Sequence, residues 1–313
     1  MLPDGAPVRT IGTVPELPDL TVYVEALTSR LRSATCTLVR ILHPFVLRSA
    51  SPPVSSLVGG SVAGVGRLGK QIVIRFDGGL FAVIHLMIAG RLRWLEDAGS
   101  PSRKLGLAAI GFSTGTVVLT EAGTKKRASL RIVSGEEGLA ELDRGGLELF
   151  AASFDEFANR LARENHTLKR ALTDPRLFAG IGNAYSDEIL HRSRLSPAAL
   201  TSRITGEESR RLFGACRDVL REWTERLRRE AGGSFPAGVT AFRPEMAVHG
   251  KYNQPCPVCR TPVQRIVFAE NECNYCPECQ TGGRLLADRA LSRLLKGDWP
   301  ATVGELEEFR RPH

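Results

Sequence analysis

Two pairs of cysteines near the C-terminal end of the chain constrain its fold most strongly. Each pair has the spacing CxxC, at Cys256 and Cys259 and again at Cys276 and Cys279, and sixteen residues separate the two pairs. A CxxC turn brings two thiolates to one tetrahedral ion, and a hairpin of this length returns the second pair to complete four ligands. The spacing predicts one structural Zn²⁺ ion, because four thiolates leave no open coordination position. A redox-active CxxC or a chance spacing is the alternative.

One further cysteine lies close to the two pairs. Cys273 lies three residues before Cys276 and does not fit the CxxC spacing, so we interpret it as a bystander and not as a ligand.

The chain of 313 residues carries 42 Lys and Arg against 34 Asp and Glu, a net charge of +8. This balance favours a polyanionic partner such as nucleic acid, although many basic proteins bind nothing anionic in particular.

The sequence lacks signals for membrane insertion or export. No apolar run approaches the roughly 20 residues that cross a bilayer, and the opening MLPDGAPVRT has no apolar signal region. Paired cysteines at metal-site spacing also suit a reducing compartment. We therefore expect the protein to lie in the bacterial cytoplasm and to have no membrane contact. Because nothing in the sequence indicates an oligomer, we expect a monomer.

The first half of the chain has one helical pattern followed by strand patterns. Apolar residues recur at helical spacing from Pro18 to about Ser33, with Pro18 suited to a first turn. The runs QIVIRF and LFAVIHLMI bracket the turn residues Asp77-Gly78-Gly79, and RLRWL, LAAIGF and TVVLT follow. This pattern predicts an antiparallel sandwich or a flattened barrel that ends near Gly146.

The second half is helical until the cysteine pairs begin. A long helix is expected from about Glu207 to Glu230, opened by a capping box at Thr205 and Glu208. Before it, GIGNAYSDE delivers the chain into a helix N-terminus, whose free N–H groups could hold a phosphate; an ordinary helix connection is the competing interpretation. Past the second knuckle, helical spacing predicts a packed C-terminal helix at Leu285, Leu286, Ala290 and Leu294.

Four elements in order resemble one family: PELPD before a helix, a lysine in the first strand region, GIGNAYSDE, and the paired CxxC knuckles. The chain is similar to the formamidopyrimidine-DNA glycosylase and endonuclease VIII family of base-excision repair enzymes, from Pro15 to about Cys279. The resemblance implies an α+β multidomain fold of β-sandwich, helix–two-turn–helix domain and zinc hairpin. The expected divisions are 1–14 as a leader, 15–146 as the catalytic sandwich, 150–240 as the DNA-binding helices, 245–280 as the zinc hairpin and 281–313 as a helical extension.

The resemblance also implies an activity and a nucleophile. The family comprises bifunctional DNA glycosylase/AP lyases, so the expected substrate is double-stranded DNA with oxidised bases of the formamidopyrimidine or 8-oxoguanine type, or with abasic sites. An N-terminal proline is the family's nucleophile, which gives this role to Pro15. An α-amino group titrates near 8, about two units below lysine, so a useful fraction is unprotonated at neutral pH. Its attack on C1′ expels the base and leaves an iminium ion, from which β- and then δ-elimination cut the strand.

Two further positions, Glu16 and Lys70, take catalytic roles from the same resemblance. Glu16 matches the acid/base residue that moves protons to the deoxyribose oxygen and the leaving groups. Lys70, in RLGKQIVIRF, matches the strand lysine that contacts phosphate beside the lesion, with a solvated strand-edge lysine as the alternative. Asp19 stands where many members have Glu, with helix capping as its alternative.

The expected DNA contacts follow the family in part and depart from it in part. Asn183 matches the asparagine that binds backbone phosphate, and Lys169 can add charge on the same face. Asn271 stands where the family's zinc hairpin carries an Arg, so affinity must come from elsewhere, with Lys125, Lys126 and Arg127 as candidates. The side chain that fills the gap left by an extruded base is expected to be Ile88 or Met87.

Fourteen residues precede the expected nucleophile, which is a chemical obstacle. An internal Pro15 has its nitrogen in an amide and cannot attack a sugar. We expect the translated start to lie at Val14, because a GTG codon can initiate translation in bacteria and a methionine before proline is readily removed. Proteolytic trimming or a true loss of lyase activity are the alternatives. The last of these describes a damaged-DNA-binding protein that keeps the DNA clamp and lacks the nucleophile.

Overall fold

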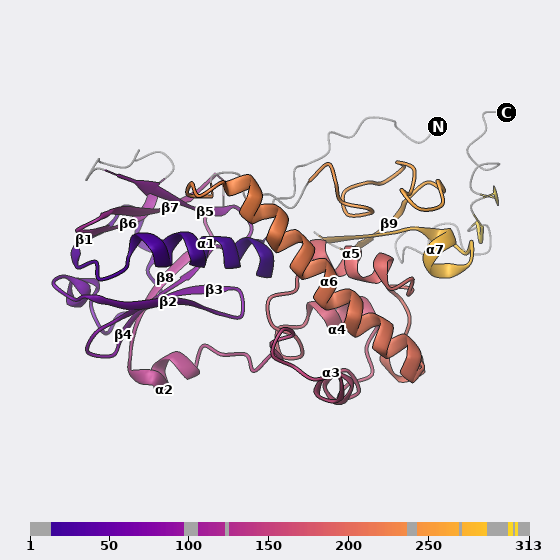
Figure 1. Ribbon diagram of the computed structural model, residues 1–313, viewed down its shortest axis with the longest axis horizontal. Coiled ribbons are helices and arrows are strands. Elements are labelled where there is room, and N and C mark those ends of the chain that lie inside the picture. The colour runs from indigo at the N-terminus through magenta and orange to yellow at the C-terminus, as the bar shows by residue number, and fades with distance from the viewer. Residues whose placement is uncertain are drawn as a thin grey trace.

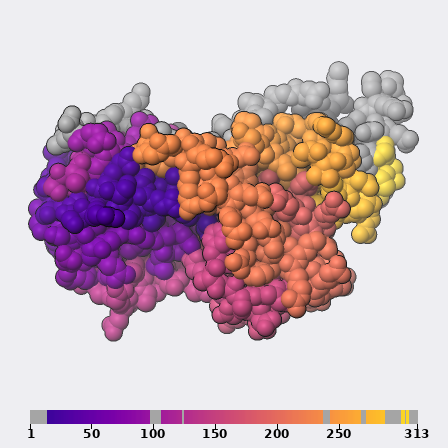
Figure 2. Space-filling model, viewed as in Figure 1, coloured from indigo at the N-terminus to yellow at the C-terminus, as the bar shows by residue number. Residues whose placement is uncertain are grey.

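The protein has two lobes, one built on strands and the other on helices and a zinc hairpin (Figures 1 and 2). The computed structural model describes residues 14–96, 106–122, 125–236, 243–268, 271–286, 300–302 and 304–305.

The first lobe is a β-sandwich, as the alternating strand patterns predict. Its eight strands form two antiparallel sheets of four, so the described strands make a sandwich and not a closed barrel. One sheet has the order β1-β6-β7-β5, with bounds Cys36–Ile41, Gly106–Phe112, Gly115–Glu121 and Gly90–Leu95. The other has the order β2-β3-β4-β8, with bounds Val62–Leu68, Gln71–Phe76, Leu80–His85 and Ser129–Ser134.

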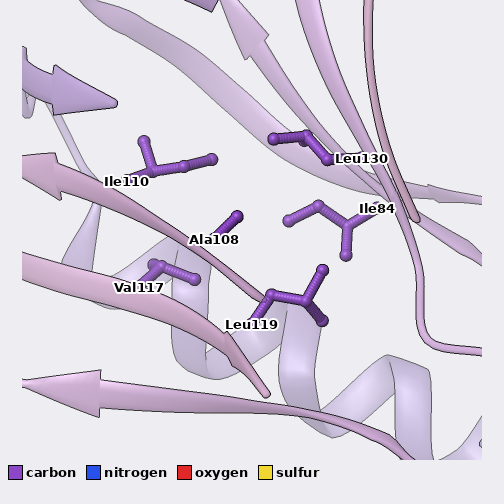
Figure 3. Close-up of a pocket in the computed structure, with 6 residues that line it drawn as sticks. All are labelled: Ile84, Ala108, Ile110, Val117, Leu119 and Leu130. Atoms are coloured by element: carbon purple, nitrogen blue, oxygen red, sulfur yellow. The ribbon is translucent and has the colours of Figure 1, made fainter. Parts of the chain in front are cut away.

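The two sheets bury a core of aliphatic and aromatic side chains between them. A small apolar void remains at its centre, and the side chains that line it come from both sheets (Figure 3). The lining consists of Ile84 and Leu130 on one side and Ala108, Ile110, Val117 and Leu119 on the other. Because no polar group lines this void, it is a packing gap of the core and not a ligand site.

Strand β4 is shorter than its apolar run predicts. It ends at His85, and the following residues form a turn into β5. Met87 has φ of +52° in this turn, and a side chain at Gly90 would collide with the Leu86 carbonyl oxygen at 2.1 Å. The last residues of the apolar run, Leu86 to Ile88, therefore belong to the turn and not to the strand.

Helix α1 (Leu17–Arg30) lies across the sandwich and begins at the boundary between the lobes (Figure 1). Its face toward the core buries Leu20, Tyr23 and Leu27, the helical spacing that the sequence shows. Pro18 occupies its first turn.

The second lobe consists mainly of helices. They are α3 (Phe154–Leu161), α4 (Leu168–Thr173), α5 (Asn183–Arg192) and α6 (Gly206–Ala231), with a short 3₁₀ turn at Thr201–Arg203. The short helix α2 (Gly135–Ala140) packs on β4 and β8 of the sandwich lobe, which also holds the 3₁₀ turns Pro44–Val46 and Val54–Leu57. The predicted capping box at Thr205 and Glu208 opens α6, and Gly232 ends it with a left-handed φ of +54°. The last turns of α6 lie beside α1, where Arg228 forms an ion pair with Glu25 at 2.5 Å.

The zinc hairpin follows α6 along the chain. It consists of β9 (Gln264–Phe268), β10 (Asn271–Tyr275) and the short α7 (Pro277–Thr281). The predicted C-terminal helix is wrong at its beginning: Leu285 and Leu286 are not helical, because their N–H groups bond instead to Ala301 O and to the Tyr275 hydroxyl. Ala290 and Leu294 lie outside the described residues.

None of the helices in the described part of the chain is both long and apolar enough to cross a membrane.

Candidate active site and zinc centre

The side chain of Glu16 crosses from the start of α1 to the start of α5. Its backbone neighbour Leu17 donates to Gly180 O at 2.9 Å, which holds α1 against the glycine-rich loop. The Glu16 carboxylate accepts hydrogen bonds from the backbone N–H groups of Gly182 at 2.5 Å, Ala184 at 2.8 Å and Tyr185 at 3.3 Å. The residue is 1 % exposed. The carboxylate is therefore fixed in a buried place between the two lobes.

These contacts revise the interpretation of GIGNAYSDE as a phosphate seat. The free N–H groups at the start of α5 do bind an anion, and that anion is the Glu16 carboxylate of the protein itself. A helix N-terminus attracts a carboxylate and a phosphate for the same reason, namely its unpaired N–H donors and its dipole. The sequence shows the donors but not their partner, because Glu16 and Gly182 are 166 positions apart in the chain.

Gly182 allows Glu16 and Lys70 to meet at one point. A Cβ atom at Gly182 would lie 2.6 Å from Glu16 Cδ and 2.7 Å from Lys70 Nζ, so any larger residue would force these side chains to move. Lys70 lies in the turn between β2 and β3. Burial lowers the pKa of Lys70 and nearby Lys169 lowers it further, while Glu16 acts in the opposite direction. Burial, followed by Lys70 and Arg131, also lowers the pKa of His85 to about 4.

Asp19 is the second buried carboxyl group near Pro15. Its Oδ2 accepts a hydrogen bond from Glu16 N at 3.0 Å and completes a capping box at the start of α1. The helix-capping alternative is thus present in the structure. Its Oδ1 is buried without a hydrogen-bond partner among the described residues. Burial raises the pKa of Asp19 to about 7.

The four predicted zinc ligands gather at one point. The Sγ atoms of Cys256, Cys259, Cys276 and Cys279 all lie within 4.8 Å of one another, with Cys256 to Cys279 at 3.9 Å and Cys259 to Cys276 at 3.3 Å. A tetrahedron with Zn–S bonds of about 2.3 Å has edges of about 3.8 Å, so the four thiols fit one zinc ion. Cys273 lies outside this cluster and is buried in β10, as expected of a bystander.

Comparison with protein families accounts for most of the chain. Residues 14–127 match the formamidopyrimidine-DNA glycosylase N-terminal domain, residues 147–232 its H2TH domain, and residues 253–282 the zinc finger found in FPG and IleRS. The chain belongs to the formamidopyrimidine-DNA glycosylase family. It is therefore a DNA-repair glycosylase with one structural zinc ion held by four cysteines.

Individual relatives agree with this assignment. The chain is 32% identical to a formamidopyrimidine-DNA glycosylase of Solibacter usitatus and 33% identical to one of Thermus thermophilus, alignments that cover 85% and 86% of this chain and 99% and 100% of the relatives. The Fpg protein of Lactococcus lactis, solved with DNA containing Fapy-dG, superimposes with a TM-score of 0.75 at 22% identity, over 85% of this chain and 100% of that one. At that identity the superposition supports the fold alone.

Two residues expected at the DNA interface of this family member have partners inside the protein. Asn183 Nδ2 donates to Glu272 O of β10 at 2.8 Å. The ammonium group of Lys169 donates to Asn183 O at 2.7 Å, to Ser186 Oγ at 2.8 Å and to Asp187 Oδ1 at 2.5 Å. These bonds account for all three Lys169 donors. Their contact with DNA stays a prediction.

The other expected DNA contacts lie in the sandwich lobe, apart from Asn271. Lys125 is exposed, Lys126 donates to the Glu121 carbonyl, and Arg127 follows them before β8. Met87 and Ile88 lie in the turn between β4 and β5. Asn271 begins β10, and its side chain is outside the described part of the structure. These roles also stay predictions.

Sequence reasoning missed three residues of the site: Gly182, Asp187 and His249. Gly182 stands beside the predicted Asn183, and its need to be glycine appears only once Glu16 and Lys70 are placed. Asp187 and His249 bond to each other at 2.8 Å across 62 positions of sequence. No local pattern marks them, because their partners come from distant segments.

Proposed function

We propose that the protein removes oxidised bases from double-stranded DNA and then cuts the resulting abasic strand, with the amine of Pro15 as nucleophile. The observation that carries the proposal is the fixed carboxylate of Glu16, directly after Pro15, held by the α5 amides with Lys70 on the other side of Gly182. Such a site places an acid/base group, a cation and a potential amine nucleophile within one buried junction. Action on chromosomal DNA would place the protein in the bacterial cytosol.

The reaction needs a free amine at Pro15. In the chain of 313 residues its nitrogen forms the peptide bond to Val14 and has no lone pair for attack. The match to the family's N-terminal domain begins at residue 14, directly before Pro15. This observation supports the proposal of a mature protein that begins at Pro15.

Each proposed side chain has a defined task in this reaction. The Pro15 nitrogen bonds to C1′ as the base departs, which forms an iminium ion and opens the sugar. Glu16 moves protons to the deoxyribose oxygen and to the leaving groups. Lys70 neutralises phosphate beside the lesion and Ile88 fills the space of the extruded base. Contacts with the DNA backbone come from Asn183, Lys125, Lys126, Arg127 and Asn271, and Lys169 adds positive charge on the same face.

The names of the relatives support the proposed substrate class. The relatives are named for formamidopyrimidine lesions, and the L. lactis protein was solved with Fapy-dG DNA and with oxidised-pyrimidine DNA. We propose formamidopyrimidine or 8-oxoguanine lesions as the substrates of this chain.

Borohydride trapping on an abasic-site duplex tests the nucleophile. Borohydride reduces a protein–DNA iminium to a stable cross-link, so we expect cross-linking by a protein that begins at Pro15 and none by the 313-residue chain. A Lys70→Ala version of the shorter protein is the matched control, because Lys70 is the other amine at the site. Its cross-link should persist at a reduced rate; a cross-linked residue that maps to a lysine, or cross-linking by the longer chain, would overturn Pro15 as the nucleophile.

The competing function is a damaged-DNA-binding protein without lyase activity. The amide nitrogen of Pro15 in the longer chain is the specific observation that favours it. Binding of both forms to abasic DNA without any cross-link would support this second function and exclude the first.

A further inference from the structure

One turn of α5 carries a buried carboxylate that joins three separate parts of the chain. Asp187 is 0 % exposed, and its Oδ1 accepts a hydrogen bond from Lys169 Nζ of α4 at 2.5 Å. Its Oδ2 contacts His249 Nδ1 at 2.8 Å and accepts a hydrogen bond from Asn274 N of β10 at 3.1 Å. An ionised carboxylate has no proton to give, so His249 Nδ1 is the donor.

The next residue repeats this role with backbone partners. Glu188 is 6 % exposed, and its carboxylate accepts hydrogen bonds from the N–H groups of Ala247 at 2.8 Å, Val248 at 2.9 Å and His249 at 3.0 Å. These three residues belong to the segment that leads into the zinc hairpin. Two adjacent carboxylates of α5 therefore hold both the entry to the hairpin and its second strand.

Asp187 and Lys169 each favour the charged form of the other. Burial is the largest single influence on both groups, raising the pKa of Asp187 and lowering that of Lys169. Lys169 and His249 together reverse it for Asp187, and Asp187, Cys273 and Glu16 together reverse it for Lys169, so the pKa of Asp187 lies below and that of Lys169 above its usual value. A buried ion pair seldom stabilises a fold more than apolar residues of the same size. What such a pair does supply is a fixed geometry, because each charge tolerates few alternative positions.

The same helix holds the proposed catalytic carboxylate at its N-terminus, one turn before Asp187. The Glu16 carboxylate is bound by the N–H groups of Gly182, Ala184 and Tyr185. Asp187 follows Ala184 by three residues, about 4.5 Å along the helix axis at 1.5 Å per residue. A rigid turn of helix is therefore all that separates the hairpin contacts from the Glu16 contacts.

We propose that Asp187 is a positioning residue that makes docking of the zinc hairpin and placement of the Glu16 carboxylate one mechanical unit, through α5. The hairpin thus sets the geometry of the acid/base group as well as offering a surface to DNA. The inference rests on the proposed function for the chemistry of Glu16. The placement of Glu16 can be measured without any activity.

Amide hydrogen exchange in the zinc-loaded full chain is the primary test. Asp187→Asn keeps the size of the side chain, removes the charge that holds Lys169, and turns an N–H donor toward His249 or Asn274. If the two contacts form one unit, the amides of residues 182–185 should exchange at least about tenfold faster, since their bonds to Glu16 open more often. Unchanged exchange in folded Asp187→Asn would overturn the proposal. Asp218→Asn, exposed on α6, is the matched control and should leave these amides unchanged.

A pair of substitutions at His249 repeats the test without touching α5. His249→Asn keeps an N–H donor near the position of Nδ1, and His249→Leu removes it. The Leu variant should speed exchange at residues 182–185, and the Asn variant should largely restore protection. Equal effects of the two would contradict the proposal, and this pair also decides the case if Asp187→Asn does not fold.

Single-turnover kinetics separate positioning from simple loss of DNA binding. In a protein that begins at Pro15, Asp187→Asn should lower the base-excision rate at saturating DNA at least about tenfold, because a displaced Glu16 acts on the chemical step. A change in DNA affinity alone, with the maximal rate preserved, would overturn the proposal. If the parent protein excises no base, the proposed function fails, and the exchange result still decides the placement of Glu16.

Discussion

The sandwich and the junction between α5 and the zinc hairpin bury different chemistry. Between its sheets the sandwich buries aliphatic and aromatic side chains, and its strands contribute only Thr116 and Glu121 to the buried polar residues. The junction buries a polar set of side chains, comprising Ser186, Asp187, Glu188, His191, His249, Gln264, Asn274 and Gln280. Apolar packing depends on volume, whereas a buried polar network depends on each partner being present. The two halves should therefore fail under different perturbations.

Removal of zinc is expected to have the largest effect, and to be confined to the junction. Cys256→Ser deletes one of four ligands in a site whose binding free energy, on the order of 10 kcal/mol or more, is also folding energy for so small a hairpin. The hairpin should lose its zinc and its protection from hydrogen exchange, while the strands β1 to β8 keep theirs. Zinc content and exchange on the same samples measure both.

Cys273→Ser is the matched control for the zinc ligand. It changes a buried cysteine of the same hairpin that lies outside the four-thiol cluster. This variant should retain one zinc ion per chain. A protein that loses its zinc through Cys273→Ser, or keeps it through Cys256→Ser, has a different ligand set from the one described here.

The opposite perturbation should damage the sandwich and spare the junction. Leu130→Ala removes a side chain, 1 % exposed, that already borders the central void (Figure 3), so it enlarges a cavity whose walls cannot collapse easily. A loss of about 3 kcal/mol in the free energy of unfolding is expected. Leu38→Ala on the exposed edge strand β1, at 45 % exposure, should cost less than about 1 kcal/mol. Urea unfolding followed by exchange of the strand amides measures both variants, and equal losses would contradict this account of the core.

The contrast also explains which features the sequence predicts. Strands β3 to β7, α1, α6 and its capping box follow from local strand patterns, helical spacing and cap residues, all within a few positions of one another, whereas β1, β2 and β8 were not predicted. The zinc ligands are equally accessible, because CxxC spacing is itself a local pattern. The contacts of Glu16 with α5 and of Asp187 with His249 join residues 166 and 62 positions apart, and no local pattern marks either pair. Prediction of the C-terminal helix failed at Leu285 and Leu286 because Tyr275 and Ala301, distant partners, take their N–H groups.

Gly182 lies where the two halves meet, and its substitution should affect the reaction more than the fold. In Gly182→Ala the new methyl group would lie 2.6 Å from Glu16 Cδ and 2.7 Å from Lys70 Nζ, so both side chains must move. The single-turnover excision rate should fall about 100-fold, equivalent to about 2.7 kcal/mol of transition-state stabilisation. Gly214→Ala in α6 is the matched control, since a Cβ there meets nothing within 4 Å. Near-normal excision by Gly182→Ala would show that Glu16 and Lys70 need not be held as the structure holds them.

The smallest expected effect concerns the buried carboxyl of Asp19, whose pKa in the folded protein is about 7 against 3.8 in the unfolded chain. Between these values the unfolded chain releases the proton and the folded protein keeps it, so the contribution of Asp19 to stability falls as pH rises from about 4 to about 7. Asp19→Asn cannot ionise and keeps an oxygen to accept from Glu16 N. The free energy of unfolding of Asp19→Asn, relative to that of the parent, should therefore increase by about 2 kcal/mol between pH 5 and pH 7. The basis is about 1.4 kcal/mol per pH unit, reduced because the folded protein relaxes around the charge of the parent's carboxylate. Urea unfolding at several pH values measures the difference; a constant gap between the two proteins would mean that Asp19 is already ionised at pH 5, and that the start of α1 carries two carboxylate charges beside Pro15 instead of one.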